Sequence, residues 1–131
     1  MTIRYATDTD TASIVRTIQP KGMTYNTTTH VQADVKAGRL LVAEEAGRLL
    51  GSCAIVPETA WGYTAIKRMC VYTEGRGVAS ALVRFVCSLG LGVVGATPWN
   101  DNPAMAHILE KHGFQYQYTF AKNYNFYKKS A

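Results

Sequence analysis

The most informative stretch of this sequence is Glu74-Gly75-Arg76-Gly77-Val78-Ala79, a glycine-rich turn past the middle of the chain. An apolar run over residues 64–72 precedes it and predicts a strand, and apolar residues at helical spacing follow it from Val78 to Leu89. Such a turn leaves backbone N–H groups free at the positive end of a helix dipole, where glycine lets phosphate oxygens approach closely. The turn therefore predicts either a phosphate-binding site or an ordinary connection from a strand to a helix.

A second glycine cluster, Gly90-Leu91-Gly92-Val93-Val94-Gly95, matches the dinucleotide-binding pattern GxGxxG letter for letter. Its surroundings do not match, because it lies between the end of a helix and a strand, and no helix N-terminus faces its glycines. We therefore exclude a dinucleotide site. We expect the cluster to end one helix and to begin a wholly apolar strand over residues 91–96.

The rest of the chain alternates between helical and strand patterns. Before the turn, the order is a strand over residues 3–6, a helix over residues 8–18 that stops at Gln19 before Pro20, a weaker helix over residues 29–36, and strands over residues 40–43 and 49–56. After it come a helix from Asn102-Pro103 to Gly113 and two strands around a turn at residues 121–123. These elements predict a mixed α/β fold with a partly antiparallel sheet, in a single domain of residues 1–131.

Composition narrows the class of protein. The chain has 131 residues, of which 47% are hydrophobic and 18% are charged, so it can bury a core without a disulfide or a metal. Its three cysteines, Cys53, Cys70 and Cys87, form no CxxC pair, which favours a reducing compartment and argues against a metal site. No apolar run approaches the roughly 20 residues that span a bilayer, and no export signal is visible, so we expect a cytoplasmic protein without membrane contact.

The net charge is +5, from 14 Lys and Arg against 9 Asp and Glu. This favours an anionic ligand or nucleic acid as partner, but it is equally typical of a basic surface that binds neither. The basic residues are scattered along the chain rather than gathered in one segment. Charge alone therefore does not select a partner.

Two motifs together resemble those of the GNAT family of acyl-CoA N-acyltransferases. Residues 69–82 resemble its pyrophosphate-binding motif R/Q-x-x-G-x-G/A, with Gly77 and Ala79 at the small positions. Residues 102–114 resemble its motif N-x-x-A-x-x-x-Y-E-K-x-G-F, with Met105 where alanine is usual. The central hairpin and the first strand also fit, so the resemblance covers nearly the whole chain.

The resemblance implies a GNAT-type fold, with a mostly antiparallel central sheet, one splayed parallel strand pair and about four flanking helices. It also implies acetyl-CoA as the donor: the turn amides would hold the pyrophosphate, the preceding strand would polarise the thioester carbonyl, and Asn102 would bind the pantetheine region. The cofactor-binding residues so implied are Met69, Cys70, Val71, Gly75, Arg76, Gly77, Val78, Ala79, Ser80 and Asn102. The phosphates of CoA would account for part of the positive charge, which weakens the nucleic-acid interpretation.

The catalytic residues are harder to assign from the motifs. Leu109 stands where many family members have a tyrosine that protonates the departing thiolate, and leucine has no proton to give. We expect Leu109 to be packed, Glu44 to be the candidate base, and Tyr116 or Tyr124 to be the candidate acid. Glu74 also departs from the pattern, because arginine or glutamine is usual there.

Three further side chains have a structural interpretation. Tyr116 and Tyr118 are two residues apart on a predicted strand, so we expect them to share one face. His112 lies near the end of a predicted helix, where a cation is favourable. Cys70 is expected to be a small buried residue rather than a nucleophile.

These features predict an acetyl-CoA-dependent N-acetyltransferase, in which a primary amine attacks the thioester directly in a ternary complex. The alternatives are a CoA-binding module without catalysis and, less favoured, a small basic nucleic-acid-binding protein. The sequence does not identify the amine acceptor, although Trp61, Tyr63 and Trp99 are candidates to line its site. We expect a monomer or a homodimer, since the edge of the terminal hairpin would suit strand pairing between two copies.

Overall fold

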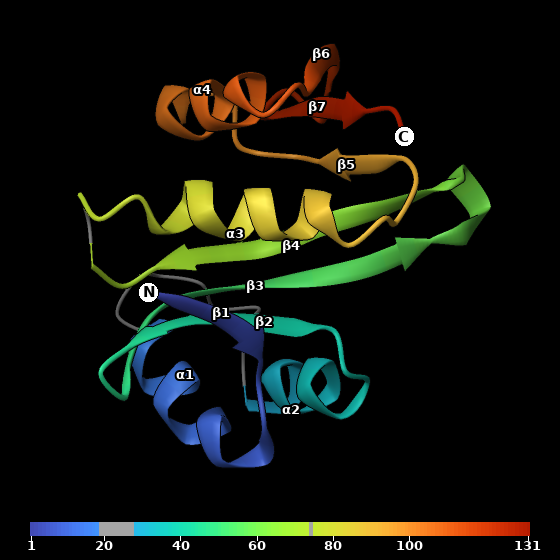
Figure 1. The fold of residues 1–131 in the computed structure, drawn as a ribbon. Coiled ribbons are helices and arrows are strands. Elements are labelled where there is room, and N and C mark those ends of the chain that lie inside the picture. The colour runs from blue at the N-terminus through green and yellow to red at the C-terminus, as the bar shows by residue number, and fades with distance from the viewer. Residues whose placement is uncertain (19–27, 74) are drawn as a thin grey trace.

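One sheet of seven strands lies at the centre of the structure, a computed structural model that describes residues 1–18, 28–73 and 75–131 (Figure 1). The strands are β1 (Thr2–Tyr5), β2 (Leu40–Glu45), β3 (Arg48–Glu58), β4 (Tyr63–Val71), β5 (Val94–Ala96), β6 (Gln115–Phe120) and β7 (Tyr124–Lys129). Their order across the sheet is β1-β2-β3-β4-β5-β7-β6. Strands β4 and β5 pair in parallel and the other neighbours pair antiparallel, as the family resemblance implied.

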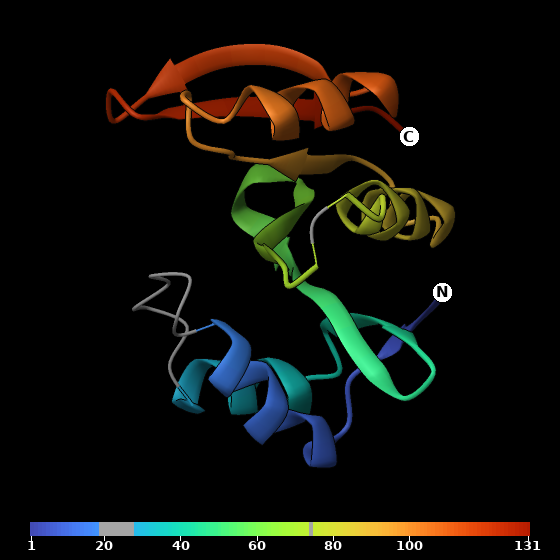
Figure 2. The ribbon, with the colours of Figure 1, turned by 90° about the vertical axis from the view of Figure 1, so that its left-hand side faces the viewer.

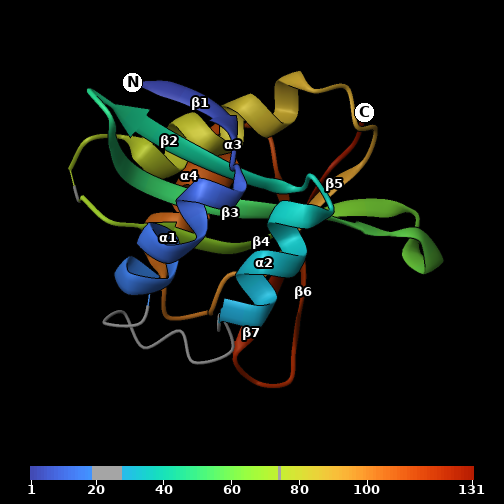
Figure 3. The same ribbon diagram turned by 90° about the horizontal axis from the view of Figure 1, so that it is seen from below.

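Helices cover both faces of this sheet. They are η1 (Asp8–Asp10), α1 (Thr11–Ile18), α2 (Thr28–Lys36), η3 (Thr59–Trp61), α3 (Val78–Ser88) and α4 (Pro103–Lys111). Figures 1 and 3 place α1 and α2 on one face and α3 on the other. In Figure 2, α1 and α2 lie at one end of the molecule, and α4 lies at the other end with β6 and β7.

The hydrophobic core is divided in two by the sheet, as strand alternation dictates. Leu41 and Ala43 of β2 pack in the cluster that contains the apolar face of α3. Leu40 and Val42, the alternate residues of the same strand, pack in the cluster that contains α1 and α2. Because successive side chains of a strand point to opposite faces, one short apolar strand contributes to both layers.

The structure differs from the sequence prediction mainly at the ends of elements. Strand β5 has three residues instead of the six expected over residues 91–96, because Gly90 and Gly92 take positive φ and Leu91 is 37% exposed. The first helix begins as the 3-10 turn η1, in which the Asp10 side chain accepts from the Thr7 amide. Its expected end at Gln19 and Pro20 lies outside the described residues. Among the helices of the described ranges, none combines the length and the apolar character needed to cross a membrane.

Candidate functional site

A cleft opens where the parallel strands β4 and β5 diverge. The two strands pair from Thr64 opposite Val94 to Ile66 opposite Ala96, and beyond Ile66 this edge of β4 has no neighbouring strand among the described residues. The cleft has a volume of about 430 Å³. It is lined by Ile66, Lys67, Arg68, Met69, Ala96, Thr97, Pro98, Trp99, Asn102, Met105 and Tyr124. The divergence leaves backbone groups of β4 available to a ligand, because they have no strand partner there.

A β-bulge in β4 forms one wall of this cleft. Lys67 pairs with Ala54 and Cys70 pairs with Ser52, so Arg68 and Met69 together oppose the single residue Cys53 of β3. Arg68 has φ of 53°, in the left-handed region that favours glycine and costs other residues about 1–2 kcal/mol. A bulge of this kind bends its strand and re-aims its backbone and side chains. The bulge thus determines which backbone groups β4 presents to the cleft.

Cys53, the residue opposite the bulge, is fully buried. Burial in this apolar environment raises the pKa of its thiol to about 12, so the thiol stays protonated at neutral pH. Cys70 is also buried and packs in the cluster beneath α1 and α2, as expected for a small core residue.

The side chain of Arg68 binds a buried carboxylate on helix α2. Asp34 is 2% exposed, and its Oδ2 accepts from Arg68 Nε at 2.9 Å while its Oδ1 accepts from Arg68 Nη2 at 2.8 Å. Arg39 Nε donates to the same Oδ1 at 2.8 Å. Asp34 is not among the residues predicted for the site, although it lies with Val31 and Val35 on the buried face of an amphipathic helix. A carboxylate on the buried face of a helix needs a charged partner, so the position of Asp34 in the sequence could have predicted an ion pair there.

The glycine-rich turn lies at the N-terminus of α3, outside the lining of the cleft. Gly75 and Gly77 have φ of 76° and 68°, and open space surrounds the position that a Cβ would take at either residue. Gly77 caps α3 without a side-chain hydrogen bond, so the first amides of the helix receive no side-chain acceptor from their cap. These groups point outward at the positive end of the helix dipole, which is an arrangement suited to an anion.

Two side chains of the predicted phosphate site already have partners. Arg76 forms an ion pair with Glu45 at the end of β2. Ser80 Oγ lies 2.8 Å from His112 Nε2. Burial, together with the charges of Lys111, Arg84 and Lys129, lowers the pKa of His112, which favours a neutral ring over the expected cation. The anion-binding capacity of this turn therefore lies in its backbone.

The other predicted cofactor residues divide between the cleft and the core. Met69 and Asn102 line the cleft. The Asn102 side chain also accepts from the Met105 amide at 3.1 Å and caps α4. Val71 is partly buried against the cluster on the α3 face, and Val78 is buried within that cluster.

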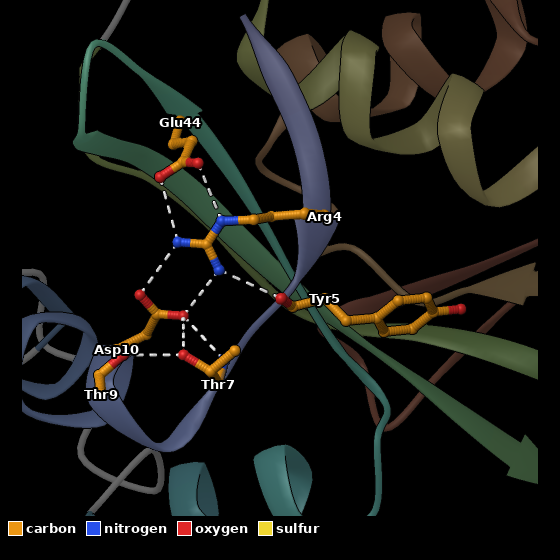
Figure 4. Close-up of polar contacts among 6 residues, drawn as sticks. All are labelled: Arg4, Tyr5, Thr7, Thr9, Asp10 and Glu44. Atoms are coloured by element: carbon orange, nitrogen blue, oxygen red, sulfur yellow. Dashed lines mark hydrogen bonds and ion pairs between the residues drawn. The ribbon is translucent and has the colours of Figure 1, made fainter.

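The candidate base Glu44 does not line the cleft; it lies in an ion-pair cluster with Arg4 and Asp10 (Figure 4). Its two carboxylate oxygens accept from Arg4 Nε at 3.0 Å and Arg4 Nη2 at 3.1 Å. The same guanidinium donates to both oxygens of Asp10, at 2.8 Å and 3.1 Å. Hydrogen bonding from Arg4 lowers the pKa of Glu44, and an anion stabilised in this way is a weak proton acceptor.

The candidate acids Tyr116 and Tyr124 lie on different sides of the terminal hairpin. Tyr124 lines the cleft, and its ring lies 5.1 Å from that of Trp99. Trp99, one of the acceptor candidates, also lines the cleft. Tyr116 does not line the cleft; its hydroxyl lies 2.8 Å from Thr119 Oγ1. The other two acceptor candidates, Trp61 and Tyr63, do not line the cleft either, and Trp61 is 79% exposed.

The expectation that Tyr116 and Tyr118 share one face is wrong. Tyr116 pairs with Tyr127 and Tyr118 pairs with Phe126, so a register shift lies between them. Tyr127 and Phe126 are consecutive in β7 and point to opposite faces. The ring of Tyr116 contacts Tyr127 and the ring of Tyr118 contacts Phe126, so the two tyrosines lie on opposite faces as well. A bulge of one residue reverses the alternation that the sequence predicts.

Leu109 is fully buried in the core between α4 and the sheet, as expected. It cannot contribute a polar group to the cleft. Of the three candidate catalytic residues, Tyr124 alone lines it.

Comparison with solved structures identifies the fold. A GNAT-family acetyltransferase from Bacillus cereus superposes with a TM-score of 0.85 at 17% identity, over 98% of this chain and 96% of that one. Ard1 from Thermoplasma volcanium gives a TM-score of 0.83 at 22% identity, over 99% and 97%. A putative acetyltransferase from Salmonella typhimurium, solved with its cofactor acetyl-CoA, gives 0.75 at 18% identity, over 98% and 92%. Protein-family models and curated protein sequences gave no match. This chain has the GNAT fold of acyl-CoA N-acyltransferases, which the resemblance of its motifs predicted.

Proposed function

We propose that this protein is an N-acetyltransferase that takes the acetyl group from acetyl-CoA and transfers it to a primary amine. The observation that carries the proposal is the cleft where β4 and β5 diverge, with a β-bulge in its wall. It combines unpaired strand backbone with a volume suited to a ligand arm, in a fold shared with acetyltransferases.

The binding roles follow from position. The backbone amides of residues 75–79 would hold the pyrophosphate at the N-terminus of α3. Met69 and Asn102 line the cleft and would contact the pantetheine arm. Lys67, which also lines the cleft, adds positive charge near an anionic ligand, although Glu58 partly neutralises it through an ion pair of 2.7 Å.

The chemistry would depend on backbone donors and on one phenol. Acetyl-CoA supplies the acetyl group as a thioester when it is bound. Backbone N–H groups of the β4 bulge would bind the thioester carbonyl oxygen, where negative charge develops during attack by the amine. The Tyr124 hydroxyl, the candidate acid that lines the cleft, would donate a proton to the departing sulfur. The proton that the amine nitrogen loses on acylation would pass to the resulting phenolate and restore the phenol.

A second candidate function is CoA binding without catalysis. The observation that favours it is Leu109, which is buried in the core at the position where many family members have a tyrosine. Turnover separates the two functions, because a binding module would bind CoA and transfer no acetyl group.

The test of catalysis is acetyl transfer from acetyl-CoA to a panel of primary amines and peptides, detected as product mass. We expect turnover in the wild type and a loss of about 10²–10⁴-fold in kcat for Tyr124→Phe. Tyr116→Phe is the matched control and should keep wild-type kcat, because it removes a hydroxyl outside the cleft. Equal losses in both variants would contradict the role of Tyr124, and binding without transfer to any acceptor would favour the binding module.

The test of the phosphate site is Ala79→Glu, with Ala79→Gln as control. A substitution at Gly77 would confound the result, because its positive φ strains any side chain there. Glutamate suits the first turn of a helix but would repel a pyrophosphate bound to the same amides. Calorimetry should find CoA binding weakened at least about tenfold by glutamate and little changed by glutamine. Equal affinity in the two variants would place the phosphates elsewhere.

We also propose a cytoplasmic location for the protein, as a monomer or a homodimer. The three cysteines are all free thiols, which is typical of a reducing compartment.

A further inference from the structure

Arg68 has a backbone conformation that its own residue type disfavours. It is the residue of positive φ in the β4 bulge, and it lines the cleft. A non-glycine residue keeps such a conformation only where the surrounding structure fixes it, and such residues cluster at functional sites. A contact of Arg68 must therefore hold its backbone in this conformation.

The contact is the two-point hydrogen bonding between Arg68 and Asp34. The planar guanidinium meets both carboxylate oxygens, at 2.9 Å and 2.8 Å, which restricts its orientation as well as its distance. Asp34 is itself immobilised, because it is 2% exposed and lies on α2 between the buried residues Val31 and Val35. A rigid connection therefore runs from the core face of α2, through Asp34 and Arg68, to the wall of the cleft.

We propose that Asp34 is a positioning residue for catalysis: its ion pair with Arg68 holds the β4 bulge in the conformation that presents backbone N–H groups to the acyl carbonyl. This inference rests on the proposed function. It assigns a role in catalysis to helix α2, although α2 contributes no residue to the lining of the cleft. Asp34 acts through Arg68 and touches no reacting atom. Small displacements of oriented donors reduce transition-state stabilisation strongly, so the anchor matters to rate more than to binding.

Arg39 provides a matched control within the same cluster. Its Nε donates to Asp34 Oδ1 at 2.8 Å, as close as the Arg68 contacts, but it lies in the connection between α2 and β2 and not in the bulge. Arg39→Ala and Arg68→Ala each remove one guanidinium from Asp34. If the cluster serves stability alone, the two variants should behave alike.

The experiment compares Arg68→Ala, Arg68→Gly, Arg39→Ala and Asp34→Asn in the full chain. We expect Arg68→Ala and Asp34→Asn to lower kcat at least about tenfold, with affinity for CoA within about threefold of wild type, and Arg39→Ala to keep kcat within about twofold. Arg68→Gly relieves the backbone strain but lacks the anchor, so its kcat should fall as in Arg68→Ala. Asp34→Asn leaves Arg68 in place for any direct contact with substrate, so a loss of kcat in this variant comes from the lost anchor. Wild-type kcat in either Asp34→Asn or Arg68→Gly would overturn the proposal.

A second readout does not depend on turnover. Hydrogen exchange of the amides that are bonded between β3 and β4 on either side of the bulge should accelerate in Arg68→Ala and Asp34→Asn and stay at the wild-type rate in Arg39→Ala. Equal acceleration in Arg39→Ala and Arg68→Ala would reduce the cluster to a stabilising role and overturn the inference. A wild-type protein that transfers no acetyl group would contradict the proposed function instead, and the exchange measurement would still decide whether Asp34 holds the bulge.

Discussion

The described residues up to Arg76 and the C-terminal hairpin of β6 and β7 lie at different places in the molecule and have different contacts (Figure 2). All seven ion pairs of the described residues join partners between residues 1 and 76. All six pairs of aromatic rings among those residues include at least one ring from residues 116–127. The first region thus adds ion pairs to its apolar core, whereas the second is distinguished by ring contacts.

The difference follows from what each region can bury. Helices α1 and α2 cover β1 to β3 and enclose Asp34, so a carboxylate inside that layer must be paired. Strand β6 is the edge of the sheet and each of its six residues is exposed, so ring contacts across to β7 have to supply its packing. The two regions should therefore respond to different perturbations.

The largest effect is expected at the buried carboxylate. Asp34→Ala leaves Arg39 and Arg68 without their partner and should lower the free energy of unfolding by about 3–5 kcal/mol. Urea denaturation measures this loss, and hydrogen exchange should accelerate in α2 and β4 before it does in β7. Asp101→Ala, which changes an exposed aspartate, is the control and should cost less than about 0.5 kcal/mol. A loss below about 1 kcal/mol for Asp34→Ala would contradict a stabilising role for the ion pairs of Asp34.

The next effect tests the aromatic region. Phe126 is 8% exposed and its ring lies 5.3 Å from those of both Tyr63 and Tyr118, so Phe126→Ala should cost about 3 kcal/mol. Phe120→Ala is the matched control at 41% exposure and should cost less than about 1 kcal/mol. Added salt should leave both losses unchanged. Equal losses in the two variants would mean that ring burial does not stabilise the hairpin.

Acid should destabilise the first region before the second. Hydrogen bonding from Arg4 lowers the pKa of Asp10 below its ordinary 3.8, so its contribution is complete above that value and is lost as the pH falls through the folded value. Asp10→Asn should cost about 1–2 kcal/mol at neutral pH and little in acid, where the wild type has lost the same interaction. Unfolding measured from pH 7 down to about pH 2.5 checks this. Parallel pH profiles for the two proteins would contradict it.

The smallest effect is expected at a solvent-facing ion pair. Lys67 Nζ lies 2.7 Å from Glu58 Oε1, but the lysine side chain is 39% exposed, so Lys67→Ala should cost less than about 1 kcal/mol. About 1 M NaCl should abolish the difference, since it screens exposed charges and affects the Asp34 cluster much less. Thermal unfolding at low and high salt measures both. A salt-independent loss would assign Lys67 a packing role.

Periodicity predicted most of the fold. The helical spacing from Val78 onward recovered α3 to within one residue, because this helix buries one defined face. The apolar run from Leu40 to Ala43 recovered the start of β2, which is buried on both faces and continues for two more residues to Glu45. The three-residue β5 was overestimated, since Leu91 is apolar in sequence but follows a glycine with positive φ.

The site was less accessible to sequence reasoning because it depends on pairing between distant strands. Met69, Asn102 and Tyr124 were identified from motifs and residue type, and they line the cleft. The bulge at Arg68 and its anchor at Asp34 were missed, since 34 residues separate the two partners and neither has a local signal for the other. The same kind of irregularity reversed the face of Tyr118.

The position of Cys53 gives the molecule a native reporter. Its thiol is fully buried in the core cluster that contains the apolar face of α3, and its pKa is about 12, so an alkylating reagent reaches it only after this part of the core opens. Because Cys53 lies opposite Arg68 and Met69 in the sheet, the rate of its modification records how often the core opens beside the bulge. Modification of Cys53, distinguished from that of Cys70 and Cys87 by the mass of its peptide, can therefore time an opening of the core next to the cleft, with no label introduced into the protein.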